Sequence, residues 1–423
     1  MSNRTEPPEM HRVAGNGLLD RRFLLRAGGA LAAGGGVATT AHADPLKVAQ
    51  WMREPGAPFM PYGQPSHFES PVVRTYASLP GTTGTGSSRT PLHALEGMIT
   101  PNGLHFERLH NGIPDIDPDQ HQLVIHGLVR RPLSFTIEAL SRYPMVSRVA
   151  FIECGGNGGA LYQPKPAQLG VQGLHGLLSC AEWTGVPLAV LLDEAGVDPR
   201  AKWLLAEGGD AASMSRSVPL SKAMDDAIVA LYQNGERVRP GNGYPMRLLL
   251  PGFEGNTQVK WLRRLMLIEE PMMTKDETSK YTITLPDGKS QQFVFPIEAK
   301  SVITRPSPGH QLDRAGIYEI SGLAWSGYGR ITKVEVTADG GKSWAPAALQ
   351  EPVLPRALTR FRLPWQWDGG PAILGSRAVD ESGYVQPSRD ALLAERGGNT
   401  IYHYNGITCW GVPTSGELSH VYA

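Results

Sequence analysis

A strand that ends in a cysteine and a run of glycines reads Phe151-Ile152-Glu153-Cys154-Gly155-Gly156-Asn157-Gly158-Gly159. Such a loop lets the backbone approach a bulky ligand, because glycines have no Cβ atom in the way. A free cysteine is most often a small buried apolar residue, but a core cysteine does not need several glycines around it. As a thiolate, Cys154 can be a nucleophile or a ligand for a soft metal. No nearby histidine identifies itself as the base that a nucleophile needs.

Two further clusters of polar residues flank this loop in the sequence. In the segment 105–114, Arg108 and His110 are two positions apart, so in an extended chain both side chains point the same way and can hydrogen-bond an anion. In the segment 242–262, Arg247 and Lys260 flank an apolar strand and a glycine turn, and together they can clamp a phosphate. A solvated loop and ordinary surface salt bridges are the alternative interpretation of these clusters.

The composition excludes some classes of partner. The 423 residues include 40 lysines and arginines and 40 aspartates and glutamates, so the formal net charge is zero. This balance lacks the basic surface expected of a nucleic-acid-binding protein or of a polybasic membrane-surface protein. The 49 glycines and 35 prolines, alongside 41% hydrophobic residues, indicate a folded chain rich in loops and long enough for two or three domains.

The first 43 residues are typical of an export signal. The run Asp20-Arg21-Arg22-Phe23-Leu24-Leu25-Arg26 precedes a small, glycine-rich apolar stretch that ends at Ala41-His42-Ala43. We therefore predict a twin-arginine signal peptide at 1–43, a mature chain that begins near Asp44, and a periplasmic location. The apolar stretch is too short to predict a membrane span. The alternative is a cytosolic protein with a basic, frayed terminus.

The cysteine content bears on redox chemistry. Cys154, Cys180 and Cys409 are too few, and odd in number, for a disulfide framework. We expect Cys180 and Cys409 to be structural. The sequence contains no Cys-x-x-Cys-His haem attachment site, so we expect no haem on this chain. Electrons taken up here would then leave on another protein.

The rest of the chain divides at about residue 295. Residues 44–100 are rich in proline, glycine and serine, and we expect an irregular arm packed over the surface. Within 44–295, short strand and helix patterns mix, which predicts an α+β domain. Within 296–423, strand patterns alternate with turns and predict an immunoglobulin-like β-sandwich. The expected elements are a strand at 120–129, a helix at 187–195, a hairpin over 228–235, and strands at 316–324, 331–337, 359–363 and 375–379.

These clusters, in this order, resemble the molybdenum-binding domain of the sulfite oxidase family. That family has Phe-x-Arg-Asn-His and then Cys-Ala-Gly-Asn-Arg-Arg, where this chain has Phe106-Glu107-Arg108-Leu109-His110 and then 154–159. The family's Trp-x-Gly-Val-Pro-Leu matches 183–188, its His-Gly-Phe-Pro-Val-Arg matches 242–247, and its Ser-Val-Lys-Trp-Leu matches 258–262. The resemblance implies an α+β molybdopterin-binding domain at 44–295 and an all-β, immunoglobulin-like dimerisation domain at 296–423.

The resemblance also implies a cofactor, one molybdenum held by molybdopterin per chain. Cys154 would be the thiolate ligand of the metal, Tyr281 would stand near the metal's oxo group, and Arg108 would carry substrate charge or bind the cofactor. The residues that would hold the cofactor are Phe106, Arg108, His110, Asp210, Asn242, Arg247, Gln258, Val259 and Lys260. An ordinary strand tyrosine is the alternative for Tyr281, and the spacing after Asp210 is shorter than in the family.

The main departure from the family follows the cysteine directly. Gly158 and Gly159 stand where sulfite oxidases carry two arginines, one of which helps to bind sulfite. A pocket without that charge should bind the free dianion poorly, because a desolvated dianion needs its charge paired. A loop opened by glycines suits a substrate carried on another protein. In this respect the chain is most similar to the sulfane dehydrogenase catalytic subunits of the periplasmic thiosulfate-oxidising system.

That similarity implies a reaction and its partners. The sulfane sulfur of a persulfide on a carrier-protein cysteine would be oxidised toward a sulfonate by oxo transfer at molybdenum, and a c-type cytochrome subunit would accept the electrons. The assembly would be a homodimer or a heterotetramer. One alternative is a sulfite dehydrogenase that oxidises sulfite to sulfate with cytochrome c as acceptor. Another is a non-catalytic exported binding protein on the same fold, which metal content would distinguish.

Overall fold

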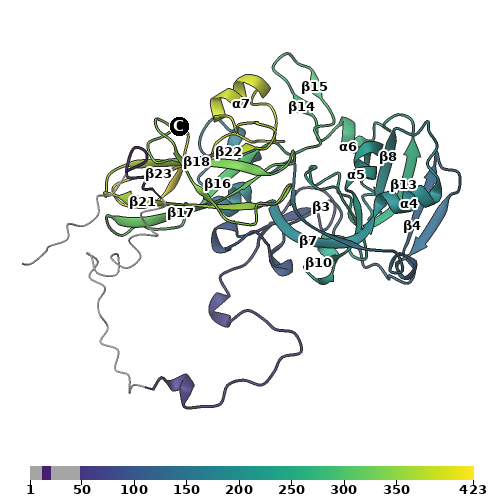
Figure 1. The fold of residues 1–423 in the computed structure, drawn as a ribbon, viewed down its shortest axis with the longest axis horizontal. Helices are drawn as coiled ribbons and strands as arrows, with labels where there is room; N and C mark the ends of the chain where they lie inside the picture. The colour runs from purple at the N-terminus through teal and green to yellow at the C-terminus, as the bar shows by residue number, and fades with distance from the viewer. Residues whose placement is uncertain (1–11, 21–47) are drawn as a thin grey trace, which may run out of the picture.

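The structure is a computed structural model of the chain, and it describes residues 12–20 and 48–423. Two lobes lie side by side: an N-terminal lobe with two larger sheets, and a C-terminal β-sandwich (Figure 1). The twin-arginine motif and the predicted cleavage site lie outside the described residues. Among the residues that are described, no helix is long and apolar enough to cross a membrane.

The N-terminal lobe is built on two five-stranded sheets that share a hydrophobic core. One has the order β5-β4-β13-β8-β9, with β13 parallel to β4, and the other has the order β11-β10-β7-β6, with β12 added beside β10. Leu265 and Leu204 of the first sheet pack in one cluster with Val229 of the second. The bounds are β4 Gln122–Gly127, β5 Leu133–Thr136, α2 Ile137–Leu140, β6 Val146–Glu153, α3 Val171–His175, β7 Leu178–Pro187, α4 Leu188–Ala195, β8 Trp203–Gly208, β9 Ser215–Pro219, α5 Leu220–Asp225, β10 Ile228–Gln233, β11 Glu236–Arg237, β12 Arg247–Leu249, β13 Leu262–Ile268 and α6 Lys275–Thr278.

Helix α4 shows how local sequence determines an element. Its buried leucines and alanine recur at the spacing of one helix face. Gly196 ends the helix in a left-handed conformation with φ of 72°, which residues with a Cβ atom adopt only with strain. The predicted helix at 187–195 is therefore confirmed, as are the strand at 120–129, seen as β4, and the hairpin formed by β10 and β11.

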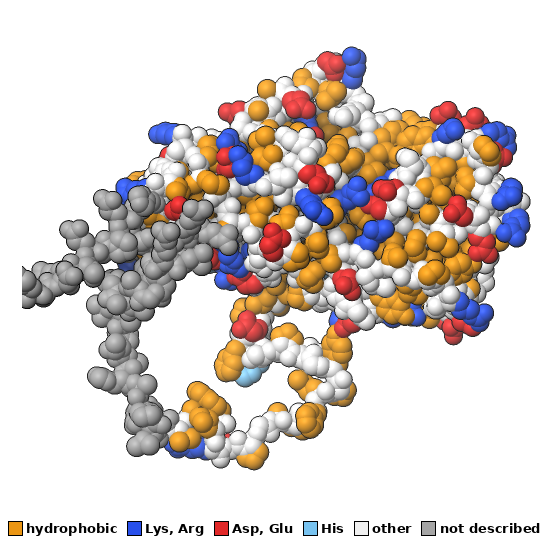
Figure 2. Space-filling view, in the orientation of Figure 1, with side chains coloured by type: hydrophobic (Ala, Val, Ile, Leu, Met, Phe, Trp, Pro, Cys, Tyr) orange, Lys and Arg blue, Asp and Glu red, His pale blue; other side chains and the backbone are white. Residues whose placement is uncertain are grey.

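An arm leads into the N-terminal lobe through a small antiparallel sheet of β1 Thr75–Ser78, β2 Gly86–Arg89 and β3 Glu107–Leu109. The expectation that the arm packs over the surface is wrong for most of 48–72, which loops away from the body (Figure 1) and touches it through Tyr62, whose hydroxyl donates to Glu236 of β11. Apolar side chains along it remain in solvent (Figure 2), and Trp51 is 83% exposed. Among its described residues, this segment forms only two three-residue 3-10 helices, Gln50–Met52 and His67–Glu69, which are too short to present an apolar face to the body.

The C-terminal lobe is a sandwich of two antiparallel sheets, which confirms the predicted fold class. The sheets have the orders β16-β17-β21-β20 and β19-β18-β22-β23-β24, and the four predicted strands fall within β17, β18, β21 and β22. Trp325, Trp365 and Trp410 are fully buried in its core. The bounds are β16 Lys300–Arg305, β17 Gly316–Trp325, β18 Ile331–Thr337, β19 Ala345–Pro346, β20 Ala348–Leu349, β21 Thr359–Trp367, β22 Ala372–Asp380, α7 Arg389–Arg396, β23 Cys409–Val412 and β24 Ser419–Val421.

A buried carboxylate joins the two lobes. Glu153, the last residue of β6, is 1% exposed and accepts hydrogen bonds from Lys300 Nζ at 2.5 Å and from Trp325 Nε1 at 2.7 Å. Lys300 begins β16 and Trp325 ends β17, so both donors belong to the C-terminal lobe. Asn157 Nδ2 donates a third bond at 2.9 Å from the glycine loop. The residue before Cys154 is therefore positioned by the opposite lobe.

Replacing Glu153 with alanine should lower the free energy of unfolding by about 3–5 kcal/mol, because Lys300 would remain buried without its counter-charge. Urea denaturation of the purified chain measures this loss. The matched control is Glu182→Ala on the neighbouring strand β7, where the side chain is exposed and a change within about 0.5 kcal/mol is expected. Equal losses for the two variants would contradict the structural role of Glu153.

Candidate functional site

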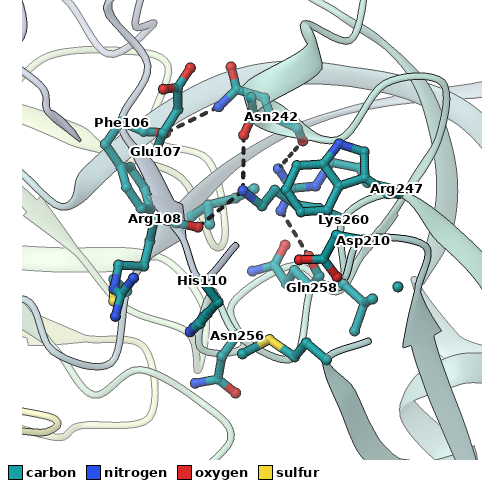
Figure 3. A pocket seen from close by; sticks show the side chains of 18 of the residues that line it. Phe106, Glu107, Arg108, His110, Asp210, Asn242, Arg247, Asn256, Gln258 and Lys260 are labelled. Atoms are coloured by element: carbon teal, nitrogen blue, oxygen red, sulfur yellow. Dashed lines mark hydrogen bonds between the residues drawn. The ribbon is translucent and has the colours of Figure 1, made fainter. Parts of the chain in front are cut away.

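A cavity of about 730 Å³, open to solvent, lies where strands of both N-terminal sheets end. Every residue that the sequence analysis proposed for the site lines it, and Figure 3 labels most of them. These residues are Phe106, Arg108, His110, Cys154, Asp210, Asn242, Arg247, Gln258, Val259, Lys260 and Tyr281. The fold therefore brings the three sequence clusters together, while the role of each residue stays a prediction.

Cys154 follows β6 directly, and backbone hydrogen bonds hold it on both sides. Its amide donates to the carbonyl oxygen of Leu177 at 3.0 Å, and its carbonyl oxygen accepts from the amide of Asn157 at 2.8 Å. Burial raises the pKa of the thiol, although a hydrogen bond from the Gly156 backbone and the charge of Arg108 act in the opposite direction. Metal binding at this sulfur would therefore displace a proton.

The other two cysteines have the character expected of structural residues. Cys180 and Cys409 are buried and, like Cys154, are free thiols. Burial raises the pKa of each to about 12, so neither is a reactive thiolate at neutral pH.

Gly155, Gly158 and Gly159 are needed in the loop after Cys154, because neighbouring groups or the backbone conformation exclude larger residues there. A Cβ atom on Gly155 would lie 2.8 Å from Glu254 Oε2, and one on Gly159 would lie 2.8 Å from the carbonyl oxygen of Ile401. Gly158 has a φ of 80°, a backbone conformation that favours glycine. Segment 401–404 of the C-terminal lobe thus fills the space beside the two positions where arginines would stand in a sulfite oxidase.

Two cationic side chains converge in one wall of the cavity (Figure 3). Lys260 Nζ donates to the carbonyl oxygen of Arg108 at 3.1 Å, and Arg247, which is buried, donates to the carbonyl oxygens of Asn242 at 2.8 Å and Gln258 at 2.9 Å. Burial lowers the pKa of Arg247 to about 9. Burial, followed by the charge of Arg247, lowers the pKa of Lys260 to about 7. An anion bound here would reverse both effects, because it stabilises the cationic forms.

The polar atoms of this wall fit a molybdopterin. Buried Arg247 Nε and Asn242 Oδ1 have no hydrogen-bond partner among the described residues, and buried polar atoms rarely stay unpaired. Burial raises the pKa of Asp210 in the same cavity, although Lys260 acts in the opposite direction. A pterin offers ring N–H groups and ring acceptors, and its phosphate is an anion. Both the unpaired atoms and the cations therefore match groups of the cofactor that the family resemblance implies.

Tyr281 and His110 form a neutral pair in the cavity, with Tyr281 Oη 3.5 Å from His110 Nε2. Burial, with a smaller contribution from Cys154, raises the pKa of Tyr281 well above its ordinary value. Burial and the charge of Arg108 lower the pKa of His110 to about 4. Both side chains are therefore uncharged at neutral pH, so they offer hydrogen bonds rather than charge.

The sequence analysis missed a buried ionic group behind the glycine loop. His403 Nε2 lies 2.7 Å from Glu254 Oε2, and Arg216 donates to Glu254 Oε1 at 3.3 Å. Burial raises the pKa of Glu254, but His403 and Arg216 outweigh it, and the pKa is lowered overall. The amide of His403 also donates to the carbonyl oxygen of Gly155 at 2.7 Å. This group therefore supports the loop that carries Cys154.

The group reaches the cavity through Arg216, whose guanidinium carbon lies 5.2 Å from the centre of the Tyr281 ring. Its members come from β9, from the turn after β12 and from the C-terminal lobe, so no local motif connects them. The signal nearest to it in the sequence was the Gly255-Asn256 turn, which directly follows Glu254.

Sulfate binding to the cofactor-free chain should weaken as the pH rises through about 7, because Lys260 loses its proton there. Above that pKa the affinity should fall by up to about tenfold per pH unit, the limit for one linked proton. Sulfate stays fully ionised throughout this range, so calorimetric titrations report on the protein. Lys260→Met is the control and should bind weakly at every pH. A pH-independent affinity in the unsubstituted chain would refute the assignment.

Comparisons with known proteins agree with this geometry. The family of oxidoreductase molybdopterin binding domains matches residues 110–275, and that of Mo-co oxidoreductase dimerisation domains matches 291–409. A chain in the crystal structure of the sulfane dehydrogenase SoxCD from Paracoccus pantotrophus is 48% identical, with a TM-score of 0.87 over 90% of this chain and 99% of that chain.

More distant relatives are longer proteins. Mitochondrial sulfite oxidase of Drosophila melanogaster is 31% identical over 322 residues, which cover 70% of this chain and 56% of the relative. An NADH nitrate reductase of Solanum lycopersicum is 30% identical over 314 residues, which cover 66% of this chain and 34% of the relative. The chain therefore spans about half and about a third of these relatives. With the two matched domains and the cavity, these similarities show that the chain belongs to the sulfite oxidase family of molybdenum oxidoreductases.

Proposed function

We propose that this chain is the molybdenum-binding catalytic subunit of a sulfane dehydrogenase. It oxidises the sulfane sulfur of a persulfide on a carrier-protein cysteine toward a sulfonate, and its electrons pass to a c-type cytochrome subunit. The observation that carries the proposal is the 48% identity to a chain of a sulfane dehydrogenase, 99% of which this chain covers. The glycines at 158 and 159, which supply no cation for a free dianion, support the same substrate class. The expectation that these glycines open the loop is wrong, because Ile401 and Tyr404 occupy the space beside them.

The cavity residues divide between holding the cofactor and meeting the substrate. Bound molybdopterin supplies two-electron redox chemistry and oxygen-atom transfer. We assign Cys154 as the protein ligand of the metal, because its thiol emerges into the cavity from a loop held by both lobes. The residues that we assign to hold the pterin and its phosphate are Phe106, Arg108, His110, Asp210, Asn242, Arg247, Gln258, Val259 and Lys260.

Arg108 and Tyr281 would act on the substrate side. The sulfonate formed on the carrier is an anion with its charge spread over three oxygens, and a cationic guanidinium stabilises that charge. Arg108 also lines a second surface depression together with Lys275, Lys280 and Asp276, so positive charges outnumber negative ones beside the cavity. The neutral hydroxyl of Tyr281 can donate a hydrogen bond without adding charge.

The lack of a cation at Gly158 and Gly159 supports the proposal that the substrate is carried on a protein. Segment 401–404 leaves no room for a longer side chain at Gly159. The loop after Cys154 therefore supplies no fixed cation at that position. Free sulfite would need its double negative charge paired when it loses water. A persulfide on a carrier brings a protein surface that contributes its own recognition.

We also propose that the chain is exported and that it acts in an oligomeric assembly. A twin-arginine signal at 1–43 would direct the folded chain to the periplasm, where the catalytic domain at 44–295 and the dimerisation domain at 296–423 would act. The sequence has no Cys-x-x-Cys-His site, which supports a separate cytochrome subunit as the electron acceptor. The assembly would be a homodimer or, with the cytochrome, a heterotetramer.

The decisive experiment combines metal analysis with cytochrome c reduction by the purified complex. We expect about one molybdenum per chain, and at least about tenfold faster reduction with a persulfidated carrier protein than with free sulfite at equal concentration. Faster turnover of free sulfite would instead indicate a sulfite dehydrogenase. Competently matured protein that contains no molybdenum would indicate a binding protein on the same fold.

Replacing Cys154 with serine should lower turnover by at least about a hundredfold, because a neutral hydroxyl is a poor substitute for a thiolate ligand. The denaturation midpoint should change little, since Cys154 is only partly buried. Cys409→Ala is the control, because that thiol lies in the C-terminal sandwich and should be dispensable for turnover. Near-normal turnover of Cys154→Ser would show that this residue is not the metal ligand.

A further inference from the structure

Residues 12–20 pack against the C-terminal lobe near β21, far in the sequence from the residues that they contact (Figure 1). The segment is a tight hairpin in which Arg12 pairs with Leu19, and the amide of Val13 donates to the carbonyl oxygen of Leu18 at 2.9 Å. Leu18 and Leu19 are both fully buried, and Leu18 is part of the sandwich core. The hairpin is therefore bound to the lobe through its apolar side chains.

The hairpin also completes an open strand edge. Strand β20 pairs with β21 at Phe361 and Arg362, and beyond them the hairpin takes over as the neighbour of β21. The amide of Leu19 donates to the carbonyl oxygen of Pro364 at 3.1 Å, and the amide of Gln366 donates to that of Gly17 at 2.8 Å. These bonds satisfy backbone groups that a strand edge otherwise leaves unpaired.

Side-chain contacts make the site selective for this sequence. Trp365 Nε1 donates to the carbonyl oxygen of Asn16 at 2.8 Å, and Asn16 Nδ2 donates to that of Ala338 at 2.8 Å. Gly17 has a φ of 91°, and a Cβ atom there would lie 1.9 Å from the carbonyl oxygen of Gln366. A Cβ atom on Gly15 would lie 2.2 Å from Asp339 Oδ2. The site therefore accepts glycine and excludes larger residues at two positions.

We propose that this edge of β21 is a docking site for the chain's own leader, and that residues 12–20 tether the export signal to a folded C-terminal lobe. The hairpin directly precedes Arg21-Arg22 in the sequence. Its partners lie at 338–343 and at 364–366, which come together only when the sandwich has folded. The site thus distinguishes a folded chain from an unfolded one. The tethering of an export signal rests on the proposed twin-arginine leader, whereas the docking of residues 12–20 does not.

The site would also be vacated during maturation. Cleavage near Ala43 separates residues 12–20 from the mature chain, and a peptide that loses its covalent link also loses the high effective concentration that the link provides. The edge of β21 and the surface around Trp365 would then become accessible on the exported protein. The hairpin therefore behaves as a separable ligand rather than as a permanent part of the fold.

Hydrogen exchange of the full-length chain tests the docking. Gly17→Val should raise the exchange rate of the Gln366 amide by at least about tenfold, because that amide loses the carbonyl oxygen of Gly17 as its acceptor. Gly56→Val is the matched control, since a Cβ atom there meets nothing within 4 Å in the exposed arm, and it should leave the rates unchanged. Unchanged rates in Gly17→Val, confirmed with Leu18→Asp, would overturn the proposal.

Rescue by a peptide tests whether the hairpin is separable. A synthetic peptide of residues 12–20 should restore protection to the Gly17→Val chain, whereas the same peptide carrying Gly17→Val should not. Failure to restore protection at millimolar peptide would overturn the docking of a separable ligand. Protein processed near Ala43 should exchange as Gly17→Val does, and protection equal to that of the full-length chain would overturn the release. Neither readout depends on molybdenum or on sulfur oxidation, so it is independent of the catalytic proposal.

Discussion

The arrangement of the site depends on the ion pair between Glu153 and Lys300 across the lobe boundary. A carboxylate and an ammonium can be buried this deeply only when each satisfies the other. The pair fixes the end of β6, and the amide of Gly255 donates to the carbonyl oxygen of Glu153 at 2.6 Å. Two walls of the cavity, the cysteine loop and the turn after β12, therefore take their positions from one residue that is anchored in the other lobe.

Charges in this molecule follow two different rules. Glu153 and Glu254 are paired inside the protein, so removal of either partner would leave an uncompensated buried charge. Burial instead depresses the pKa values of Arg247 and Lys260, and the charge of Arg247 depresses that of Lys260 further. An enzyme that keeps such cations gives up some stability of the empty fold in exchange for affinity toward an anionic ligand. Glu153 and Glu254 thus help to hold the walls of the cavity in place, whereas Arg247 and Lys260 would gain a counter-charge from an anion bound inside it.

Local patterns in the sequence predicted much of this structure. The apolar spacing of α4, the alternating strands of the sandwich and the glycines after Cys154 each reflect nearby residues, so they could be recognised without a fold. The motif residues line one cavity because each motif lies at the end of a strand. The ionic group of Arg216, Glu254 and His403 could not be found this way. Periodicity indicates which face is buried, and it does not indicate which distant residue will pack there. The same reason applies to the hairpin at 12–20 and to the path of the arm.

The exposed arm affects the tendency of the isolated chain to associate with itself in solution. Large apolar side chains such as Trp51, Phe59 and Phe68 stand in water along a segment that projects from the body. The formal net charge is zero, so two molecules near neutral pH experience little long-range repulsion to keep those surfaces apart. Solubility and light scattering of the isolated chain should therefore be governed by a few dozen residues that contribute almost nothing to its folded core.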